Sequence, residues 1–450
     1  VSLNQAETAN GFSDGLITLN NVVDSFDNLI AIDAIPSDQL TMADAAVQVT
    51  DEVDLAKINE LRADTTGDIT VDEIKDSKEN IDEINNFAIE LGVNGPINGD
   101  VILSNADITV TNVVNREEAD VINGYNDASG TVTLTSVTDL LENVNALSST
   151  AGISIATSDL KVTDVTTLSD ATDLDSYTTG KVTLDIVTDS FDNVELIHNL
   201  TPTEENPDGV DLTAALITIT DPVSLSQAET ANGFSDGLIT LNSVIDSYDN
   251  LLAIDAIPSD ELTMADAAVK VTSNIDKAKL DTLRGDTTGT VTVADITEDK
   301  TDLDTISKYE DVDLTTANII VSNNVNKSEA DTIDGYNSTS GTVTLTSITD
   351  TVDNVEAVRT DTTISIASST ITVTNAASLD NANTFNNATS AQVTLNSVRD
   401  TYDNLISIDG IITSEVSMAD ATVHVTDEVD LQKSLQLGKI TSSVVVIDEI

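Results

Sequence analysis

The residues of this sequence best suited to chemistry are the carboxylates and amides of a recurring D-x-x-[D/E]-N motif. The motif occurs at 24–28, 76–80, 139–143, 189–193, 246–250, 350–354 and 400–404. Its oxygen atoms are the hard ligands that calcium prefers, and calcium takes about six to eight of them. Calcium is therefore the one candidate cofactor, and the candidate metal ligands are Asp24, Asp27, Asn28, Asp189, Asp192, Asp246, Asp249, Asp350, Asp353, Asp400 and Asp403.

The same motif also has the pattern of a helix start, and this interpretation is favoured. Asp24 stands at the expected N-cap, and Asp27 follows three residues later, as in a capping box. Both carboxylates would stabilise the positive end of a short helix. One such loop supplies too few oxygens for calcium, and neither an EF-hand loop nor a G-G-x-G-x-D repeat is present.

A second acidic position closes another set of expected strands. It holds Asp51, Asp164, Asp221 and Asp427, with asparagine in two repeats at Asn112 and Asn375. Asp and Asn are also common turn residues, so this position suits a turn as well as a ligand.

Nothing in the sequence indicates catalysis. The chain has no cysteine, and its two histidines, His198 and His424, occupy repeat positions that hold Asp33, Gln48 or Lys270 elsewhere. No nucleophile elbow, zinc-protease motif or P-loop is present. The least repetitive stretches, 81–105 and 196–215, are interpreted as loop insertions rather than a built site. We expect a protein that is not an enzyme.

Charge excludes several classes of partner. The chain of 450 residues has 18 Lys and Arg against 79 Asp and Glu, a net charge of -61. Nucleic acid and anionic membrane surfaces both require basic patches, so neither is expected to bind. No apolar run is long enough to insert into a membrane. The apolar content of 40% nevertheless predicts a folded chain.

The elements that must position these residues belong to an internal repeat. Residues 1–50 return at 223–272 with seven differences, and a more diverged copy begins near 377. The acidic motif returns about every 50 residues, a period typical of solenoids and linear arrays. We expect super-repeats at 1–222 (four units), 223–376 (three units) and 377–450 (partial) in one continuous solenoid. Both termini fall partway through a unit, so we expect a portion of a longer chain.

The sequence of each repeat unit predicts three strands and two short helical stretches. Alternating segments such as 153–156, 160–164 and 131–137 indicate half-buried strands, and 116–125 and 353–358 indicate helices. Short helical crossovers favour parallel strands. The predicted fold is a β-rich repeat solenoid with short helices and stacked parallel strands. A string of small β domains is the alternative, and the number of sheets stays open.

Two further patterns concern the surface and the core. Nine of the twelve aromatic residues recur at two repeat positions, which indicates packing rather than a stacking platform. Alternating threonines would project from one strand face and could order water, which leaves an ice-binding solenoid as a third function. These threonines are Thr131, Thr133, Thr135, Thr342, Thr344 and Thr346.

The repeats resemble the acidic tandem-repeat surface proteins of marine bacteria, including large adhesins and surface-layer proteins. The residues that carry the resemblance are 329–336, 338–354 and 371–384, and it extends over nearly the whole chain. It implies an extracellular, cell-surface location and a structural or adhesive role in which calcium is commonly required. We expect a secreted structural protein that self-associates into a surface layer, sheath or filament, bridged by divalent cations. A calcium-dependent adhesin stalk that presents a binding domain outside these residues is the alternative.

Overall fold

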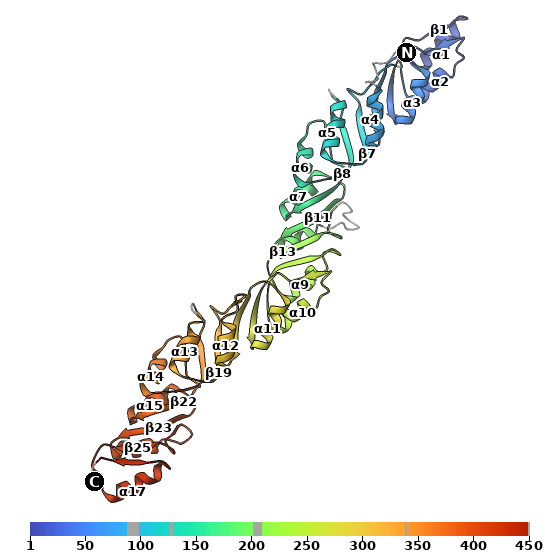
Figure 1. The fold of residues 1–450 in the computed structure, drawn as a ribbon. Helices are drawn as coiled ribbons and strands as arrows, with labels where there is room; N and C mark the ends of the chain where they lie inside the picture. The colour runs from blue at the N-terminus through green and yellow to red at the C-terminus, as the bar shows by residue number, and fades with distance from the viewer. Residues whose placement is uncertain (88–98, 127–128, 201–208, 338–339, 449–450) are drawn as a thin grey trace. The chain divides into compact units, whose positions relative to one another are not determined.

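The computed structural model describes residues 1–87, 99–126, 129–200, 209–337 and 340–448. It contains two compact units, Val1–Thr220 with Ala231–Ile239, and Asp221–Thr230 with Thr240–Ile450. Within each of these two compact units, one main strand and the helix that follows it make a coil, and consecutive coils stack (Figure 1). A sequence repeat of about 50 residues therefore contains two coils, which differ in their strands.

The first kind of coil contains what we call a regular strand. Its side chains alternate between buried and partly exposed, as in β8, where Val132, Leu134 and Val137 are buried. The short β1 (Ile17–Thr18) begins the first of these strands. The others are β2 (Asn21–Asp24), β5 (Ile69–Asp76), β8 (Val132–Asp139), β11 (Val182–Asp189), β14 (Ile239–Asp246), β17 (Val291–Glu298), β20 (Val343–Asp350), β23 (Val393–Asp400) and β26 (Val445–Ile447).

The second kind of coil contains what we call a bulged strand. In β7, Thr111 and Asn112 lie opposite Thr135 alone, because the register shifts between Val110 and Val113. The same shift occurs in β4 (Ala46–Val53), β7 (Asp107–Val114), β10 (Asp159–Thr166), β16 (Ala268–Ile275), β19 (Asn318–Val325) and β22 (Thr370–Ala377). β13 (Leu216–Val223) and the shorter β25 (Thr422–Val425) hold the same place in the repeat and are grouped with them.

A two-residue strand precedes each bulged strand. Where its pairing is given, it pairs with the start of the regular strand one coil earlier, as Val132 and Thr133 pair with Ile153 and Ser154. These strands are β3 (Leu40–Thr41), β6 (Val101–Ile102), β9 (Ile153–Ser154), β12 (Val210–Asp211), β15 (Leu262–Thr263), β18 (Val312–Asp313), β21 (Ile364–Ser365) and β24 (Val416–Ser417).

The helices are short and amphipathic, and each buries two or three apolar residues of one face, except α1, which buries Ala6 alone. Those that follow bulged strands, with α1 at the start, are α1 (Leu3–Phe12), α3 (Leu55–Asp64), α5 (Arg116–Tyr125), α7 (Leu168–Tyr177), α9 (Leu225–Ala231), α11 (Lys277–Asp286), α13 (Lys327–Asp334), α15 (Leu379–Ala388) and α17 (Leu431–Ile440). Those that follow regular strands are α2 (Phe26–Asp33), α4 (Lys78–Asn86), α6 (Leu141–Ser149), α8 (Phe191–His198), α10 (Tyr248–Asp255), α12 (Lys300–Ile306), α14 (Val352–Thr360) and α16 (Tyr402–Asp409).

The sheet in each unit is parallel and open. Regular and bulged strands alternate as neighbours, in the order β4, β5, β7, β8, β10 and β11 in the first unit and β16, β17, β19, β20, β22 and β23 in the second. The buried strand side chains face the helices, and the opposite face stays partly exposed. The predicted solenoid of parallel strands and short helices is confirmed, with the strands of each unit forming a main sheet.

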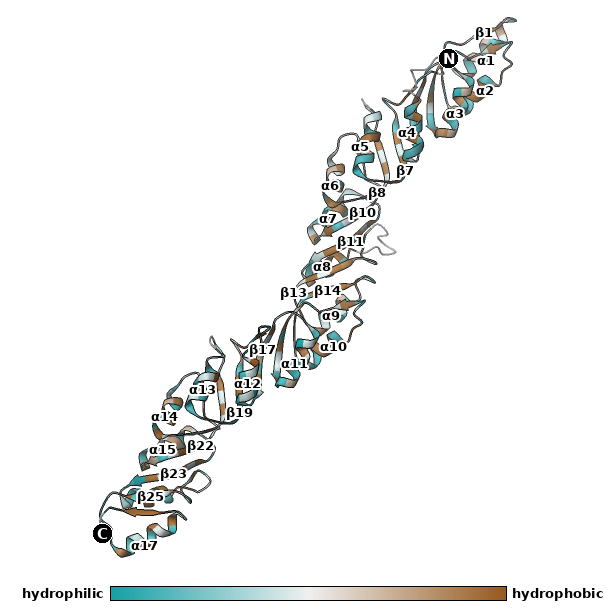
Figure 2. Cartoon of the chain, in the orientation of Figure 1, coloured by the Kyte–Doolittle hydropathy of each residue, from teal (hydrophilic) through white to brown (hydrophobic). Residues whose placement is uncertain are grey.

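The core between the sheet and the helices is aliphatic. Leu134, Val144 and Leu147 in one coil and Leu345, Ile348 and Val355 in another are fully buried. Figure 2 shows apolar segments, in brown, interspersed with polar ones, in teal, along the strands and helices. Only one face of each element is therefore apolar, and the buried layer of each coil is thin. Val, Ile and Leu fill this thin layer, so few aromatic residues are required.

The insertions expected at 81–105 and 196–215 lie partly outside the described residues, which omit 88–98 and 201–208. Their described flanks contain the end of α4, β6, the end of α8 and β12. None of the helices in the described ranges has the length and apolar character needed to cross a membrane.

Candidate functional site

The first aspartate of the acidic motif ends a regular strand and binds the helix of the preceding coil. At Asp350, Oδ2 accepts a hydrogen bond from the backbone N–H of Lys327, the first residue of α13, at 2.8 Å. Its Oδ1 accepts from the backbone N–H of Thr351 at 2.7 Å and from Nδ2 of Asn354 at 2.8 Å. One carboxylate therefore joins two helix N-termini that belong to adjacent coils.

This arrangement recurs at the end of the regular strands. In the regular strands from β2 to β23 a carboxylate accepts from the first backbone N–H of the preceding coil's helix, at 2.6–3.0 Å. We call these side chains the carboxylate ladder. Its pairs are Asp24 with Leu3, Asp76 with Leu55, Asp139 with Arg116, Asp189 with Leu168, Asp246 with Leu225, Glu298 with Lys277, Asp350 with Lys327, and Asp400 with Leu379.

Bulged strands make the same kind of contact, but side chains other than carboxylates can make it. A polar side chain at the bulge, two residues before the strand ends, also accepts from the first N–H of the preceding helix, in the pairs Asp51 with Phe26, Asn112 with Lys78, Asp164 with Leu141, Ser273 with Tyr248, Asn323 with Lys300 and Asn375 with Val352. Asp427, two residues after β25, makes the same contact with Tyr402. A single N–H donor can be satisfied by a carboxylate, an amide or a hydroxyl. This explains why Asp, Asn and Ser share this position, whereas the ladder holds only carboxylates.

The predicted capping box within the motif is wrong. The N-cap of α2 is Ser25, and Ser190, Ser247, Thr351 and Thr401 are the N-caps in the equivalent helices. The strand continues through the first aspartate, so that its side chain reaches the neighbouring helix as well as its own. The motif's asparagine donates to that carboxylate, as Asn28 does to Asp24 at 2.8 Å. The second acidic residue is exposed on the helix surface at Asp27, Asp192, Asp249, Asp353 and Asp403.

Hydrogen bonds to the ladder keep its carboxylates ionised. Burial would raise the pKa of Asp246, but the N–H groups of Leu225 and Ser247 and the side chain of Asn250 outweigh burial and lower it. The same balance of burial against N–H donors lowers the pKa of Asp24, Asp139, Asp189, Asp350 and Asp400.

The structure brings no three acidic or histidine side chains together as a metal cage within the described residues. The first carboxylate of each candidate calcium motif is directed at N–H donors, and the second lies apart on the exposed helix surface. Calcium binding by these residues therefore stays a prediction, and it would have to use exposed carboxylates.

A buried threonine hydroxyl makes a second contact between coils, which the sequence analysis missed. Thr287 Oγ1 donates to the carbonyl of Ala267 in the preceding coil at 2.6 Å and accepts from the N–H of Gly289 at 2.9 Å. Thr65, Thr178, Thr389 and Thr441 make the same bond to the carbonyls of Ala45, Ser158, Ser369 and Ala421. The signal available in the sequence is the recurring T-T-G at 65–67, 178–180 and 287–289.

Several of the recurring aromatic residues contact a neighbouring helix, whereas Phe12 is 86% exposed. Tyr336 donates its hydroxyl to Asp304 at 2.7 Å, and Tyr125 donates to Asp82 at 2.9 Å. Burial, followed by this hydrogen bond, raises the pKa of Tyr125 to about 12. At the other aromatic position, the ammonium groups of Lys57, Lys279 and Lys433 lie 5.3, 5.2 and 4.8 Å from the rings of Phe26, Tyr248 and Tyr402.

The two histidines lie in different coils and have different neighbours. The ring of His198 lies 4.8 Å from that of Phe234, and these residues line a small cavity of about 180 Å³ with Thr213 and Ser235. His424 Nε2 lies 2.7 Å from a carboxylate oxygen of Asp448.

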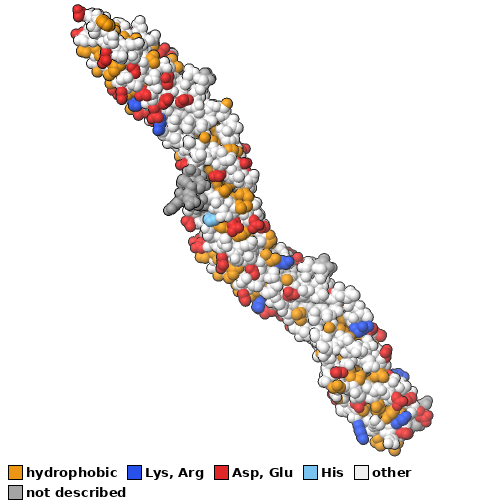
Figure 3. All heavy atoms as spheres, turned by 180° about the vertical axis from the view of Figure 1, so that it is seen from behind, with side chains coloured by type: hydrophobic (Ala, Val, Ile, Leu, Met, Phe, Trp, Pro, Cys, Tyr) orange, Lys and Arg blue, Asp and Glu red, His pale blue; other side chains and the backbone are white. Residues whose placement is uncertain are grey.

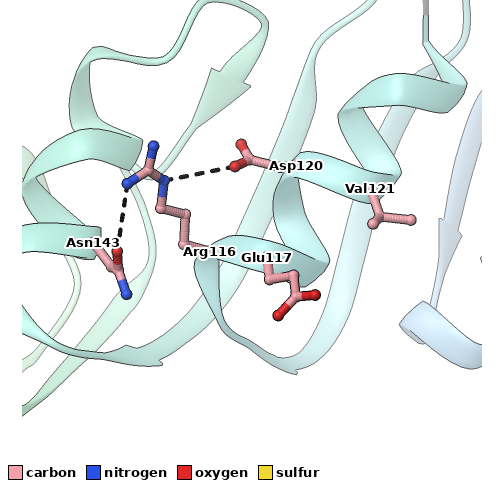
Figure 4. A pocket seen from close by; sticks show the side chains of 5 residues that line it. All are labelled: Arg116, Glu117, Asp120, Val121 and Asn143. Atoms are coloured by element: carbon pink, nitrogen blue, oxygen red, sulfur yellow. Dashed lines mark hydrogen bonds and ion pairs between the residues drawn. The ribbon is translucent and has the colours of Figure 1, made fainter.

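A larger shallow cavity of about 470 Å³ lies beside α5 and α6. Figure 4 shows the Arg116 guanidinium between Asp120 and Asn143, 3.6 Å from the first and 3.4 Å from the second. The other lining residues are Glu117 and Val121. Because the Arg116 guanidinium is already paired with Asp120 and Asn143 of the same chain, we interpret this cavity as a gap between packed helices rather than a ligand site.

The threonine pattern considered for ice binding is divided between two roles. Thr133 pairs across the sheet with Thr109, and its side chain is partly exposed on the open face. Thr135 and Thr346 instead donate their hydroxyls to the carbonyls of Val110 and Val321 at the bulge. The first triplet therefore commits the hydroxyl of Thr135 to the fold, and the second commits those of Thr346 and of Thr342, which donates to Asn318.

Titration of these groups predicts a maximum of stability in mildly acidic solution. Burial, together with the charges of Asp33 and Glu60, raises the pKa of Asp64 to about 6, and burial raises the pKa of Asp175 and Asp286. Ionisation of these groups costs stability at pH 7. For Asp64 that cost begins to fall as the pH drops through 6 and is gone near pH 4, where the carboxyl of the unfolded chain titrates. The ladder acts in the opposite sense: its lowered pKa values stabilise the fold above about pH 4, and this contribution is lost below it.

Melting temperature measured by circular dichroism should therefore rise from pH 7.5 to pH 5 and fall below about pH 4. Asp64→Asn removes one raised carboxyl, so its melting temperature should change less between pH 7.5 and pH 5. A melting temperature that falls continuously from pH 7.5 to pH 3 would contradict this prediction.

Fold and ladder together define a β-rich parallel solenoid of strand–helix coils. Comparison of the chain with models of known protein families, with curated proteins and with solved structures gives no match.

Proposed function

We propose that this chain is a secreted structural repeat protein that self-assembles at the cell surface into a layer, sheath or filament. The observation that carries the proposal is the carboxylate ladder. The residues most suited to chemistry recur in coil after coil and hold adjacent coils together. A protein whose recurrent polar groups serve its own stacking is suited to building an extended surface.

Charge supports a role for divalent cations in that assembly. Many of the basic side chains are already paired within the chain, as Lys277 is with Asp281 and Lys300 is with Asp304. The net charge of -61 therefore leaves a surplus of carboxylates at the surface, and acidic side chains outnumber basic ones on the face shown in Figure 3. Neighbouring molecules would repel one another at low ionic strength, and multivalent cations would bridge them.

Electron microscopy and light scattering, each with calcium and with EDTA, test the proposal. We expect ordered assemblies with calcium and their dispersal by EDTA, while the melting temperature of the dispersed protein changes little, because the ladder binds N–H groups. Replacing the exposed acids Asp27, Asp192, Asp249, Asp353 and Asp403 by Asn together should weaken the response to calcium. Isolated particles under every condition would contradict self-assembly and favour the adhesin stalk.

A further inference from the structure

One row of side chains on the open face of the sheet, within the first compact unit, is apolar. The register places Val165 of β10 beside Ile186 of β11, and Ile186 beside Leu216 of β13. Leu238 continues the row, because its carbonyl accepts a hydrogen bond from the N–H of Ile217, the residue after Leu216. Val165 and Leu216 are 52% and 50% exposed, and Ile186 and Leu238 are partly exposed. We call Val165, Ile186, Leu216 and Leu238 the apolar row.

Other coils hold polar or small side chains at the two central positions of this row. The residues at the position of Ile186 are Asn21, Glu73, Ser136, Ser243, Asp295, Ser347 and Ser397. Those at the position of Leu216 are Ala46, Asp107, Asp159, Ala268, Asn318, Thr370 and Thr422. The fold therefore does not need an apolar side chain at either position, and adjacent exposed apolar side chains that the fold does not need indicate a contact with another molecule.

Charges beside the apolar row favour a second copy of this chain as that molecule. Lys161 in β10 and Lys181, just before β11, lie on the same face and are two of the 18 basic residues of the chain. Lys161 pairs with Asp185 at 3.2 Å and Lys181 pairs with Asp211 at 2.5 Å. Each lysine side chain is 47% exposed, so its ammonium group is also accessible to a carboxylate of another molecule. A second copy brings the same lysines and aspartates, so that opposite charges meet across the contact.

Contact at the apolar row also costs little electrostatic repulsion. Its four side chains are uncharged, and on the side away from the lysines Thr188 pairs with Thr218. The equivalent row of an earlier coil is Glu52, Glu73 and Asp107, where two copies with a net charge of -61 would repel each other. The apolar row instead gains stability from the removal of its side chains from water.

We infer that two copies of this chain pair through the apolar row, open face against open face. The same surface lies on both sides, so the contact is isologous and closes on a dimer. A row of four side chains buries little area, so the dimer is weak and its formation depends on protein concentration. The inference rests on the proposed self-assembly and names one of its contacts. Because this contact needs no cation, dispersal of the assemblies by EDTA should end at dimers.

Sedimentation velocity of the full chain in EDTA and 0.5 M NaCl, which screens the general repulsion, tests this pairing. The wild type should form dimers as its concentration rises. The double variant Ile186→Ser/Leu216→Asp carries the residues that an earlier coil holds at these positions, Ser136 and Asp159, so it should melt like the wild type. Its dimer dissociation constant should rise at least about tenfold. Thr370→Asp adds the same charge at the equivalent position of a later coil and is the matched control, which should dimerise like the wild type.

Cross-linking locates the contact directly, because the chain has no cysteine of its own. Leu216→Cys should give covalent dimers with a bismaleimide that spans about 10 Å, the separation of two sheets packed face to face. Thr370→Cys, at the equivalent position of the later coil, should give few. Equal yields from the two variants would show random collision and overturn the pairing.

The other outcomes separate this pairing from self-assembly in general. A wild type that is monomeric in EDTA but assembles with calcium would overturn the pairing and leave self-assembly standing. A folded double variant with an unchanged dissociation constant would place the dimer contact elsewhere. Dimers in EDTA without larger assemblies in calcium would support the pairing and contradict the proposed layer or filament, whereas a wild type that is monomeric in both conditions would remove both proposals.

Discussion

Asp350→Ala should destabilise the junction between α13 and β20 by about 2–3 kcal/mol. The substitution removes the acceptor of three N–H donors, from Lys327, Thr351 and Asn354. Two of these donors lie in the first turns of helices in different coils, so both helix starts lose their carboxylate. Native-state hydrogen exchange of peptides that cover α13 and β20 should report the loss as a lower free energy of local opening.

Asp353→Ala is the matched control for this variant. It removes an equal charge three residues away, but Asp353 is exposed on α14 and is not part of the ladder. We expect a change within about 0.5 kcal/mol. Equal effects of the two substitutions would show that charge alone matters and would contradict the ladder.

Gly289→Val should destabilise the stacking of α11 and β17 on the preceding coil by about 3 kcal/mol. A side chain at Gly289 would begin well inside contact distance of the Ala267 carbonyl, which also accepts the Thr287 hydroxyl. Backbone would have to move to relieve this clash. A later coil has Ala391 at the equivalent place, so a local shift accommodates a single methyl group there, but valine requires two more. Thermal melting followed by circular dichroism measures the loss.

Gly285→Ala is the control for the glycine prediction. Gly285 lies in α11, four residues earlier, and a methyl group there would meet nothing within 4 Å. Alanine favours a helix over glycine by about 1 kcal/mol, so this variant should be slightly more stable than the wild type. If Gly289→Val melted like Gly285→Ala, the close approach of adjacent coils would be wrong.

Much of this fold could be predicted because each element has a strong local pattern. The alternation in 131–137 predicted β8, and the spacing of apolar residues in 116–125 predicted α5 with its observed bounds. Repetition then predicted stacking, since a single coil cannot bury its own apolar face. The number of sheets could not be predicted, because it depends on how far the chain turns between strands.

Only part of the candidate site could be predicted, because the partners of its carboxylates lie far away in the sequence. The motif D-x-x-D-N was recognised as a helix start, but the main partner of Asp350 is the N–H of Lys327, 23 residues earlier. Local pattern says nothing about which helix a strand-end carboxylate faces. That contact requires the register of neighbouring strands, in which Ile348 lies beside Ile371 and Val325.

Internal comparison held a further signal that could have found the ladder. The regular strands from β2 to β23 end in Asp or Glu, whereas the helix-binding position of the bulged strands holds Asp, Asn or Ser. A position that tolerates only carboxylates must satisfy more than one donor or need the charge itself. The structure shows that the carboxylates receive up to three N–H groups.

The central claim is that the recurrent carboxylates hold coils together rather than a cation. A crystal structure of the chain grown with calcium, with calcium located by its anomalous scattering, tests it most directly. We predict that Asp246, Asp350 and Asp400 keep their N–H partners and that no calcium lies within coordination distance of them. A calcium ion bound by two or more ladder carboxylates in place of the helix N–H groups would contradict the claim.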